Sequence, residues 1–569
     1  MDTRRTILWI VFSLSLILLW DAWLKYTGKP PMFFGGPAAT QTAAPAPTVA
    51  APGTGDVPTG SAQAPVPAAT PAATPAGAAA VPTTAAAAPV GQRIKIQSDV
   101  ISAEIDTVGA ELSYVELLKH HDAVDKTRNM VLLENKPGER IYLAQTGLIG
   151  GDFPNHKTLF TRVPGPSTFE AGKDTLEVAF EAEAGGVKLL KTYVFKRDSY
   201  LIEVRQQVTN LGSAPVTPEL YDQITRDGTS PAGEARFMST FTGPAFYSEA
   251  SKYRKVAFSD IEKGKAEFPK TAGDGWVALI QHYFVTAWVP KSGERTNYAR
   301  KVGENLYAVG MIESLGALAP GATTASNGKL YVGPQDQKVL EQIAPGLDLV
   351  VDYGWLTMVA KPLFWLLQFF HSLTGNWGWA IILLTITVKA AFYPLSATSY
   401  KSMAKMRAVT PRLKKIQEQH KDDRAKMNAA LMELYKTEKI NPLGGCLPIL
   451  VQMPVFIALY WTLLAAVEMR GAPWIFWIHD LTAMDPFFIL PALMIATMWV
   501  QYKLNPTPPD PVQAKVFAFM PFIFGGMMAF FPAGLVLYWV VNNLLSIAQQ
   551  WQITRTIEGK PVFGRAKKA

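Results

Sequence analysis

Five long apolar runs lie between residues 355 and 550, and they restrict the fold more than any other feature of the chain. The runs are Trp379–Pro394, Leu443–Val467, Phe487–Gln501, Val516–Phe531 and Leu535–Ile547. The interior of a bilayer offers no water to backbone N–H and C=O groups, so segments of this kind cross it as helices. The sequence therefore predicts a helical membrane core over residues 377–550.

Lys389 interrupts the first of these runs near its middle. An ammonium group at that depth costs about 2.5–3.5 kcal/mol to insert, so such a residue usually faces a wet cavity or a partner. No other apolar run carries a carboxylate placed to neutralise it. Thr385 lies four residues earlier and therefore on the same helix face. Together with Gln452 in the next run, these residues predict a helix bundle with one polar, hydrated side.

The first 27 residues have the pattern of a signal-anchor helix. The apolar stretch Ile7–Trp23 follows Arg4 and Arg5, which favour an N-terminus in the cytoplasm. Bulky and charged groups occupy Asp21–Tyr26, where a signal peptidase requires small residues. We therefore expect an uncleaved transmembrane helix over residues 1–27.

Residues 28–92 consist almost entirely of Ala, Pro, Thr and Gly. Such a segment has too few large apolar side chains to offset the entropy lost on ordering. The composition therefore predicts a disordered tether over residues 28–92.

Polar and apolar residues alternate in short runs from residue 93 to 345, for example in Thr175–Phe180 and Leu201–Val208. This period of two predicts an all-β sandwich. His120 and His121 lack the spacing of a metal site, and no acidic pair there has the spacing of a catalytic pair. The single cysteine, Cys446, excludes an internal disulfide.

The distribution of basic residues predicts how the helices are oriented. Six spans, made of the signal-anchor and five core helices, place both termini and the basic segments 400–440 and 551–569 in the cytoplasm. A seventh span at residues 355–373 would place those basic segments outside. We therefore expect residues 355–373 to lie flat on the outer membrane surface as an amphipathic helix.

The segment 401–440 contains eleven Lys and Arg residues and five Asp and Glu residues. Two apolar stripes separated by a turn at Gln419–Asp423 predict an antiparallel helical hairpin. Two roles for its basic face stay open, namely contact with solvent or anionic lipid and docking of ribosomes or nascent chains. The residues assigned to docking are Lys405, Arg407, Arg412, Lys414 and Lys415.

Several motifs follow one another along the chain in a specific order. Those of the helical part are Gly375–Gly378, Tyr393–Leu395, Ser402–Met406, Asn441–Pro448, Gln452–Pro454, Trp477–Asp480 and Phe531–Tyr538. Those of the β region are Gly275–Leu279, Thr286–Trp288 and Lys329–Gly333. In these motifs the chain resembles the YidC/Oxa1/Alb3 membrane-protein insertases, in particular the Gram-negative YidC type, over nearly its whole length except the tether.

The resemblance implies a non-enzymatic insertase and chaperone of the bacterial inner membrane, without cofactor or metal. Five core helices would enclose a hydrophilic groove open to the cytoplasm and to lipid, and the β region would be a periplasmic β-supersandwich. The positive residue of that groove is usually Arg, and here it would be Lys389. Thr385, Gln452, Tyr538 and Trp539 would line or neighbour the path, although each of these four is equally consistent with a packing role. Trp539 is a second departure, because relatives often carry Tyr there.

The partners implied are nascent membrane proteins and the lipid bilayer, with the ribosome and the Sec translocon as further candidates and no direct nucleic-acid substrate. Two other classes of function stay open. A small-solute transporter would require paired charges near the midplane and inverted repeats, which the spans do not show. The other is a membrane-tethered carbohydrate-binding or carbohydrate-processing protein, and an enzyme of that class would require two suitably placed carboxylates in the β region.

Overall fold

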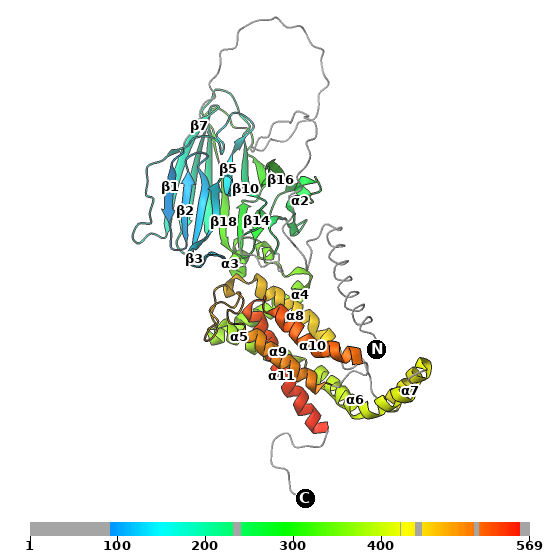
Figure 1. The fold of residues 1–569 in the computed structure, drawn as a ribbon. Helices are drawn as coiled ribbons and strands as arrows, with labels where there is room; N and C mark the ends of the chain where they lie inside the picture. Colours follow the sequence, from blue (N-terminus) through cyan, green and yellow to red (C-terminus); the bar gives the residue numbers. More distant parts are fainter. Residues whose placement is uncertain (1–90, 232–239, 421–422, 439–446, 506–510, 558–569) are drawn as a thin grey trace, which may run out of the picture. The chain divides into compact units, whose positions relative to one another are not determined.

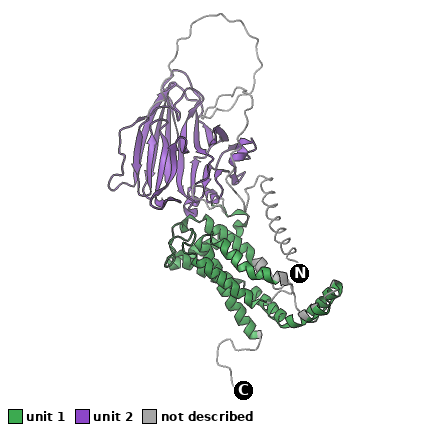
Figure 2. Cartoon of the chain, in the orientation of Figure 1, with its two compact units in different colours: residues 1–14, 351–569 green, residues 15–350 purple. Residues whose placement is uncertain are grey.

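The computed structural model describes residues 91–231, 240–420, 423–438, 447–505 and 511–557. The predicted signal-anchor (1–27), nearly all of the predicted tether (28–92), Cys446 and the tail beyond residue 557 lie outside these ranges. The chain divides into two compact units, a β unit that ends at Val350 and a helical unit that includes everything from Val351 onward (Figure 2).

The described strands of the β unit form two nine-stranded sheets in which every pairing is antiparallel (Figure 1). The first sheet has the order β1 (Arg93–Gln97), β2 (Ile101–Asp106), β3 (Glu111–His121), β4 (Asn129–Lys136), β5 (Arg140–Ile149), β10 (Glu219–Asp227), β17 (Leu306–Ser314), β16 (Arg295–Gly303), β13 (Thr271–Ala272). The second has the order β12 (Arg254–Lys255), β11 (Gly243–Tyr247), β14 (Trp276–Gln281), β15 (Phe284–Pro290), β18 (Thr323–Pro334), β9 (Leu201–Asn210), β8 (Val187–Lys196), β7 (Thr175–Ala184), β6 (Thr161–Arg162).

One hydrophobic core joins the two sheets, and the alternation of the sequence produces it. In β7, Leu176, Val178 and Phe180 are buried, whereas Thr175 and Glu177 are exposed. Successive side chains of a strand point to opposite faces, so this pattern buries one face of the strand. The buried residues of β7 belong to the same core cluster as Leu112 of the other sheet. The predicted all-β region is therefore confirmed. Its helical segments are short: α2 (Phe258–Glu262), α3 (Gln337–Ile343) and the 3₁₀ turn η1 (Leu347–Val350).

The helical unit contains eight α-helices in the described ranges. They are α4 (Thr357–Thr374), α5 (Trp377–Ala391), α6 (Tyr393–Gln419), α7 (Arg424–Thr437), α8 (Leu447–Ala465), α9 (Ile489–Leu504), α10 (Pro511–Met528) and α11 (Ala533–Ile557), with 3₁₀ turns η2 (Gly354–Leu356) and η4 (Val467–Met469). Helix α11 contacts α5, α6 and α9, while α4 packs on α5 and α8. The predicted helical C-terminal region is confirmed.

Helix α5 ends at Ala391 and α6 begins at Tyr393, so the first predicted run is divided by a sharp bend. The two axes differ by 67°, and this bent pair, from Trp377 to Leu413, has the length and composition of a membrane span. Of the remaining described helices, no single one is both long enough and apolar enough to meet the same requirement. Helix α6 also starts well before the predicted hairpin segment (400–440) and continues into it without interruption.

Asn376 fixes the start of α5. Its Oδ1 accepts hydrogen bonds from the backbone N–H of Gly378 and Trp379 at 2.9 and 3.3 Å, as an N-cap does. Its Nδ2 donates to the carbonyl oxygens of Pro473 and Trp474. A Cβ atom at Gly378 would lie 2.0 Å from Cδ1 of Trp474, so only glycine fits there. The motif Gly375–Gly378 therefore joins α5 to the loop before α9.

Candidate functional site

Lys389 lies on the buried side of α5, with 6% of its surface exposed. Its Nζ donates a hydrogen bond to Oγ of Ser546 on α11 at 2.7 Å and a longer one to Oε1 of Gln452 on α8 at 3.4 Å. It forms no ion pair with any carboxylate in the described part of the chain. The ammonium group is therefore surrounded by neutral oxygen acceptors. Hydrogen bonds from a charged donor are worth about 1.5–3 kcal/mol each, so these partners offset part of the cost of burial.

The two partners of Lys389 are themselves held in place. Gln452 donates through Nε2 to Oδ1 of Asn542, and the Ser546 hydroxyl donates to the Asn542 carbonyl oxygen at 2.7 Å. Asn542 and Ser546 are both buried. Tyr400 of α6, also buried, neighbours Ser546. We call Lys389, Gln452, Asn542 and Ser546 the lysine cluster.

Thr385 is one helical turn before Lys389 and fully buried. Its hydroxyl donates to the carbonyl oxygen of Ile381 at 2.7 Å, the local bond that threonine commonly makes within a helix. No described hydrogen bond connects it to the lysine cluster. Of the predicted groove residues, the structure thus brings Lys389 and Gln452 together and leaves Thr385 bonded to its own helix.

Tyr538 and Trp539 lie one to two turns before the lysine cluster on α11. Tyr538 is buried, and its hydroxyl neighbours Gln452 without a hydrogen bond to any described residue. The Trp539 ring meets Phe456 of α8 edge-on, with ring centroids 4.7 Å apart. The indole N–H likewise has no hydrogen-bond partner in the described ranges. Both aromatic rings therefore pack on α8, and two polar atoms remain beside them in the interior.

The polar face of α11 is the feature that sequence reasoning missed. Asn542, Ser546 and Gln550 are four residues apart and therefore lie on one side of the helix. Gln550 donates to Oδ1 of Asn505 at 3.0 Å, and Asn543 donates to Oγ1 of Thr497 at 3.3 Å. The four-residue spacing of two amides and a hydroxyl was the available signal. Asn542 and Ser546 lie inside the apolar run Leu535–Ile547, and Gln550 lies just beyond it.

The basic residues predicted for docking lie on α6. Arg412 forms an ion pair with Glu438, just after α7, with Nη1 2.6 Å from Oε1. Lys405, Arg407 and Lys415 are exposed, and the side chain of Lys414 lies outside the described part. Asp423 caps α7 by accepting from the backbone N–H of Lys426 at 3.0 Å. The α6–α7 segment thus carries exposed positive charge, as a docking face or a lipid-facing one requires.

No group of three His, Cys, Asp or Glu side chains within the described ranges is placed to hold a metal ion.

Comparison with known proteins shows which families and sequences this chain resembles. The family model described as the YidC periplasmic domain matches residues 93–366, and the one described as the 60Kd inner membrane protein matches residues 369–560. The membrane protein insertase YidC of Cupriavidus necator is 56% identical over 558 residues, covering 98% of both chains. The insertase of the same name from Bordetella parapertussis is 54% identical, also over 98% of each chain.

A solved structure described as an active YidC insertase with its first transmembrane domain resolved is also similar. Its identity is 19% and its TM-score is 0.38, over 80% of this chain and 91% of that one. The sequence relationships are much stronger than this structural one, and they cover both units. They confirm the resemblance inferred from the motifs: the chain belongs to the YidC family of membrane protein insertases, with an all-β periplasmic domain followed by a helical region.

Proposed function

We propose that this protein inserts integral membrane proteins into the bacterial inner membrane and assists their folding, with the lysine cluster as the place where a client's polar segment pauses. The observation that carries the proposal is the buried Lys389 ammonium, whose hydrogen-bond partners in the described part of the chain are the neutral side chains of Ser546 and Gln452. A structural ion pair would have a fixed carboxylate. A cation with only neutral partners can exchange them for an acidic side chain of the client.

The magnitudes support such an exchange. Two opposite charges 4 Å apart attract by about 4 kcal/mol at the effective dielectric constant of about 20 found near protein surfaces. Bringing an aspartate from water to the same depth costs about 2.5–3.5 kcal/mol on insertion scales. The two values are similar, so an incoming carboxylate would stabilise the site without being trapped in it.

Helix α5, which carries Lys389, and helix α9 are short, and this supports the same function. Helix α5 has 15 residues and α9 has 16. At 1.5 Å per residue their lengths are about 22 and 24 Å, compared with a hydrocarbon thickness of about 30 Å. Helices of this length favour local thinning of the bilayer. A polar segment of the client would then have a shorter apolar distance to cross.

The topology that we propose has six spans, with both termini and the α6–α7 segment in the cytoplasm and the β unit in the periplasm. Helix α4 is then the interfacial helix. Its exposed residues include the large apolar side chains Met358, Trp365, Phe369 and Leu373, and its opposite face, with Phe364 and Leu367, packs into the helical core. Apolar side chains exposed on one face of a helix suit the boundary between headgroups and acyl chains.

The β unit would be the β-supersandwich of the family. The exposed basic residues Lys405, Arg407 and Lys415 support the ribosome or the nascent chain as a partner of the α6–α7 segment. The Sec translocon would be a partner for some clients.

Insertion by purified protein in liposomes tests the role of Lys389. The client is a single-span protein whose short translocated tail carries either two Asp or two Asn residues. We expect Lys389→Ala to lower insertion of the acidic client about tenfold, equivalent to about 1.4 kcal/mol, and to affect the neutral client far less. Lys389→Arg retains the charge and should retain the activity. Lys515→Ala, which removes an exposed lysine of α10, is the matched control.

The outcome also separates the alternative functions. Unimpaired insertion of the acidic client by Lys389→Ala would remove the proposed role of that residue. Insertion that survives deletion of residues 93–330 would exclude carbohydrate chemistry as the source of activity. Flux of a small solute without any client would favour the transporter.

A further inference from the structure

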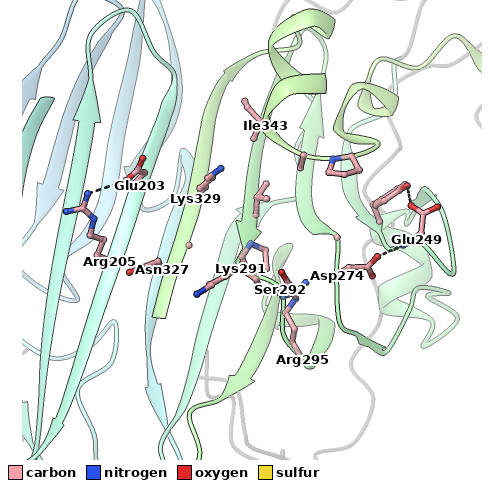
Figure 3. A pocket seen from close by; sticks show the side chains of 17 residues that line it. Glu203, Arg205, Glu249, Asp274, Lys291, Ser292, Arg295, Asn327, Lys329 and Ile343 are labelled. Atoms are coloured by element: carbon pink, nitrogen blue, oxygen red, sulfur yellow. Dashed lines mark hydrogen bonds and ion pairs between the residues drawn. The ribbon is translucent and has the colours of Figure 1, made fainter. Parts of the chain in front are cut away.

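The β unit contains a cavity of about 610 Å³ that is independent of the lysine cluster. Its walls come from β9, β15, β18 and the end of β11 in one sheet and from the start of β16 in the other. The loops at residues 249, 274–275 and 291–292 and the end of α3 complete them. In Figure 3, Glu203 and Arg205 lie at the left and Glu249 and Asp274 at the right, with Lys291 and Lys329 between them.

Arg295 is the buried charge of this cavity, with 4% of its surface exposed. Its Nη1 donates to the carbonyl oxygen of Lys291 at 2.7 Å, and no other hydrogen bond of its guanidinium to a described residue is formed. The remaining guanidinium nitrogens are not fully enclosed, unlike two of those of Arg226. Arg295 lines the cavity, so an acceptor bound there could receive hydrogen bonds from these guanidinium nitrogens.

Carboxylates lie near Arg295 but do not pair with it. Glu313 is its direct neighbour across the β16–β17 pair, and its Oε2 accepts instead from the Ser326 hydroxyl at 2.9 Å. Glu313, Asp274 and Asp222 all exert a favourable electrostatic effect on the guanidinium. Desolvation outweighs them and lowers the pKa of Arg295 below its ordinary value. None of these three carboxylates forms an ion pair with Arg295.

Two lysines add to the positive charge. Lys291 and Lys329 line the same cavity, are exposed, and form no ion pair within the described ranges. Most of the acidic groups of the cavity are engaged by cations. Glu203 pairs with Lys196 at 2.7 Å and with Arg205 at 3.4 Å, and Glu249 pairs with Lys252. Asp274, whose Oδ2 accepts from the backbone N–H of Glu249 at 3.0 Å, is the acid that remains opposite the three cations.

We propose that this cavity binds an organic phosphate, with its phosphate group held by Arg295, Lys291 and Lys329. A guanidinium presents several N–H donors in a fixed plane, and phosphate oxygens are strong acceptors for them. The flexible ammonium groups of Lys291 and Lys329 add two positive charges, which can balance the two negative charges of a phosphate monoester. The volume exceeds what a bare phosphate fills, so an attached organic group has space among Val289, Pro290 and Ile343. The phosphate is either that of a soluble ester or that of a lipid headgroup.

Titration calorimetry on the full-length protein in detergent tests the proposal, with sn-glycerol 3-phosphate as the soluble probe, dihexanoyl phosphatidic acid as the lipid probe and glycerol as the neutral control. We expect saturable binding of at least one phosphate probe and none of glycerol. Lys291→Ala with Lys329→Ala should weaken binding about tenfold or more, and so should Arg295→Gln. Lys301→Ala is the matched control, because Lys301 is paired with Glu262 outside the cavity.

The relative affinities identify the source. Binding of dihexanoyl phosphatidic acid at least about tenfold tighter than glycerol 3-phosphate assigns the site to lipid, and equal or weaker binding assigns it to a soluble ester. The double lysine variant keeps the buried arginine, so it reports on the site even if Arg295→Gln fails to fold. Absence of saturable binding of both phosphate probes up to about 10 mM overturns the proposal, as does binding that the double lysine variant leaves unchanged.

Discussion

The Nζ atom of Lys389 lies 2.7 Å from Oγ of Ser546, although the two residues are 157 positions apart in the chain. This contact joins the helix that carries the charge to the last helix of the bundle, and Gln452 joins both to α8. Every partner in the lysine cluster is neutral. The cluster therefore holds the ammonium group in a defined position while leaving its charge uncompensated, as a transient binding site for acidic segments requires.

Removing the Ser546 hydroxyl should destabilise the helical unit through Lys389. Ser546→Ala leaves a buried ammonium with one fewer acceptor, and we expect a loss of about 1–3 kcal/mol. Thermal unfolding in detergent, followed by tryptophan fluorescence, measures it. Ser372→Ala is the control, because among the residues that the structure describes this exposed hydroxyl bonds only to the carbonyl oxygen of Phe369. In a Lys389→Met background the loss should largely disappear, and a loss that persists there would show that Ser546 acts independently of the lysine.

The adjacent glycines of α10 should respond differently to the same substitution. A Cβ atom at Gly525 would lie 2.0 Å from Cγ1 of Ile495 on α9, whereas one at Gly526 would meet open space. Overpacking of this kind typically costs about 1–3 kcal/mol, so Gly525→Ala should lower the unfolding temperature. Gly526→Ala should have no adverse effect, since alanine favours the helix. Adding Ile495→Ala to the Gly525→Ala variant should restore part of its unfolding temperature. Equal unfolding temperatures of the two single glycine variants would contradict the close packing of α9 on α10.

The stability of the helical unit should depend strongly on Asp485, which lies in the loop before α9. It is buried, and its two oxygens accept from the indole N–H of Trp477 at 3.0 Å and from the backbone N–H groups of Phe487 and Leu490 at 3.1 and 2.7 Å. Asp485→Ala leaves these buried donors unpaired, so we expect a loss of more than about 2 kcal/mol.

The comparison for Asp485 is Asp423→Ala, which removes the partly exposed N-cap of α7 and should cost only about 1 kcal/mol. Thermal unfolding of both variants in detergent gives the two values. A cost for Asp485→Ala no larger than that for Asp423→Ala would mean that the Trp477 contact contributes little.

The stability of the β unit should depend on pH through two buried groups. Burial lowers the pKa of Lys191 from 10.5 to about 7, and burial raises the pKa of Asp222 from 3.8 to about 6. Between pH 7 and 10.5 the unfolded chain binds more protons at Lys191 than the folded one, so stability rises with pH, by at most about 1.4 kcal/mol per pH unit. Between pH 3.8 and 6 the folded chain binds more protons at Asp222, so stability falls as pH rises. Together, these two groups predict a minimum in the stability of the β unit near pH 6–7.

Pulse proteolysis of the full-length protein at a series of pH values and urea concentrations measures this profile. Lys191→Met should remove the rise above pH 7. It should also extend the fall in stability to higher pH. The charge of Lys191 lowers the pKa of Asp222, so removing that charge raises the pKa further. The exposed Lys173, which pairs with Glu170, is the control, and Lys173→Met should leave the rise in stability above pH 7 in place. A rise above pH 7 that persists in Lys191→Met would mean that another group is responsible.

The β unit was predictable because burial in a sheet follows a period of two that local sequence records. Leu176, Val178 and Phe180 identify the buried face of β7 without any knowledge of its neighbours. The order of the eighteen described strands was not predictable, because it depends on which distant strands pair, such as β9 with β18.

The candidate site was predictable in part for the same reason. Lys389 and Gln452 are conspicuous because each is a polar residue in an apolar run. Asn542 and Ser546 also lie in an apolar run, Leu535–Ile547, but local sequence does not show which residues of other helices they face. Their role arises only when α5, α8 and α11 meet. Thr385 shares a helix face with Lys389, but its hydroxyl is satisfied locally by Ile381, which spacing alone does not reveal.

The sharp bend at Phe392 gives α6 a mechanical property. From Tyr393 to Leu413 the helix is about 30 Å long, and its first residue follows Lys389 by only four positions. A swing of about 10° about the bend would move the far end by about 5 Å, a distance of one helical turn. A force applied near Arg412 would therefore be transmitted along α6 to the end of α5, which carries the buried cation. Binding near Arg412 and the position of Lys389 are in this way geometrically linked.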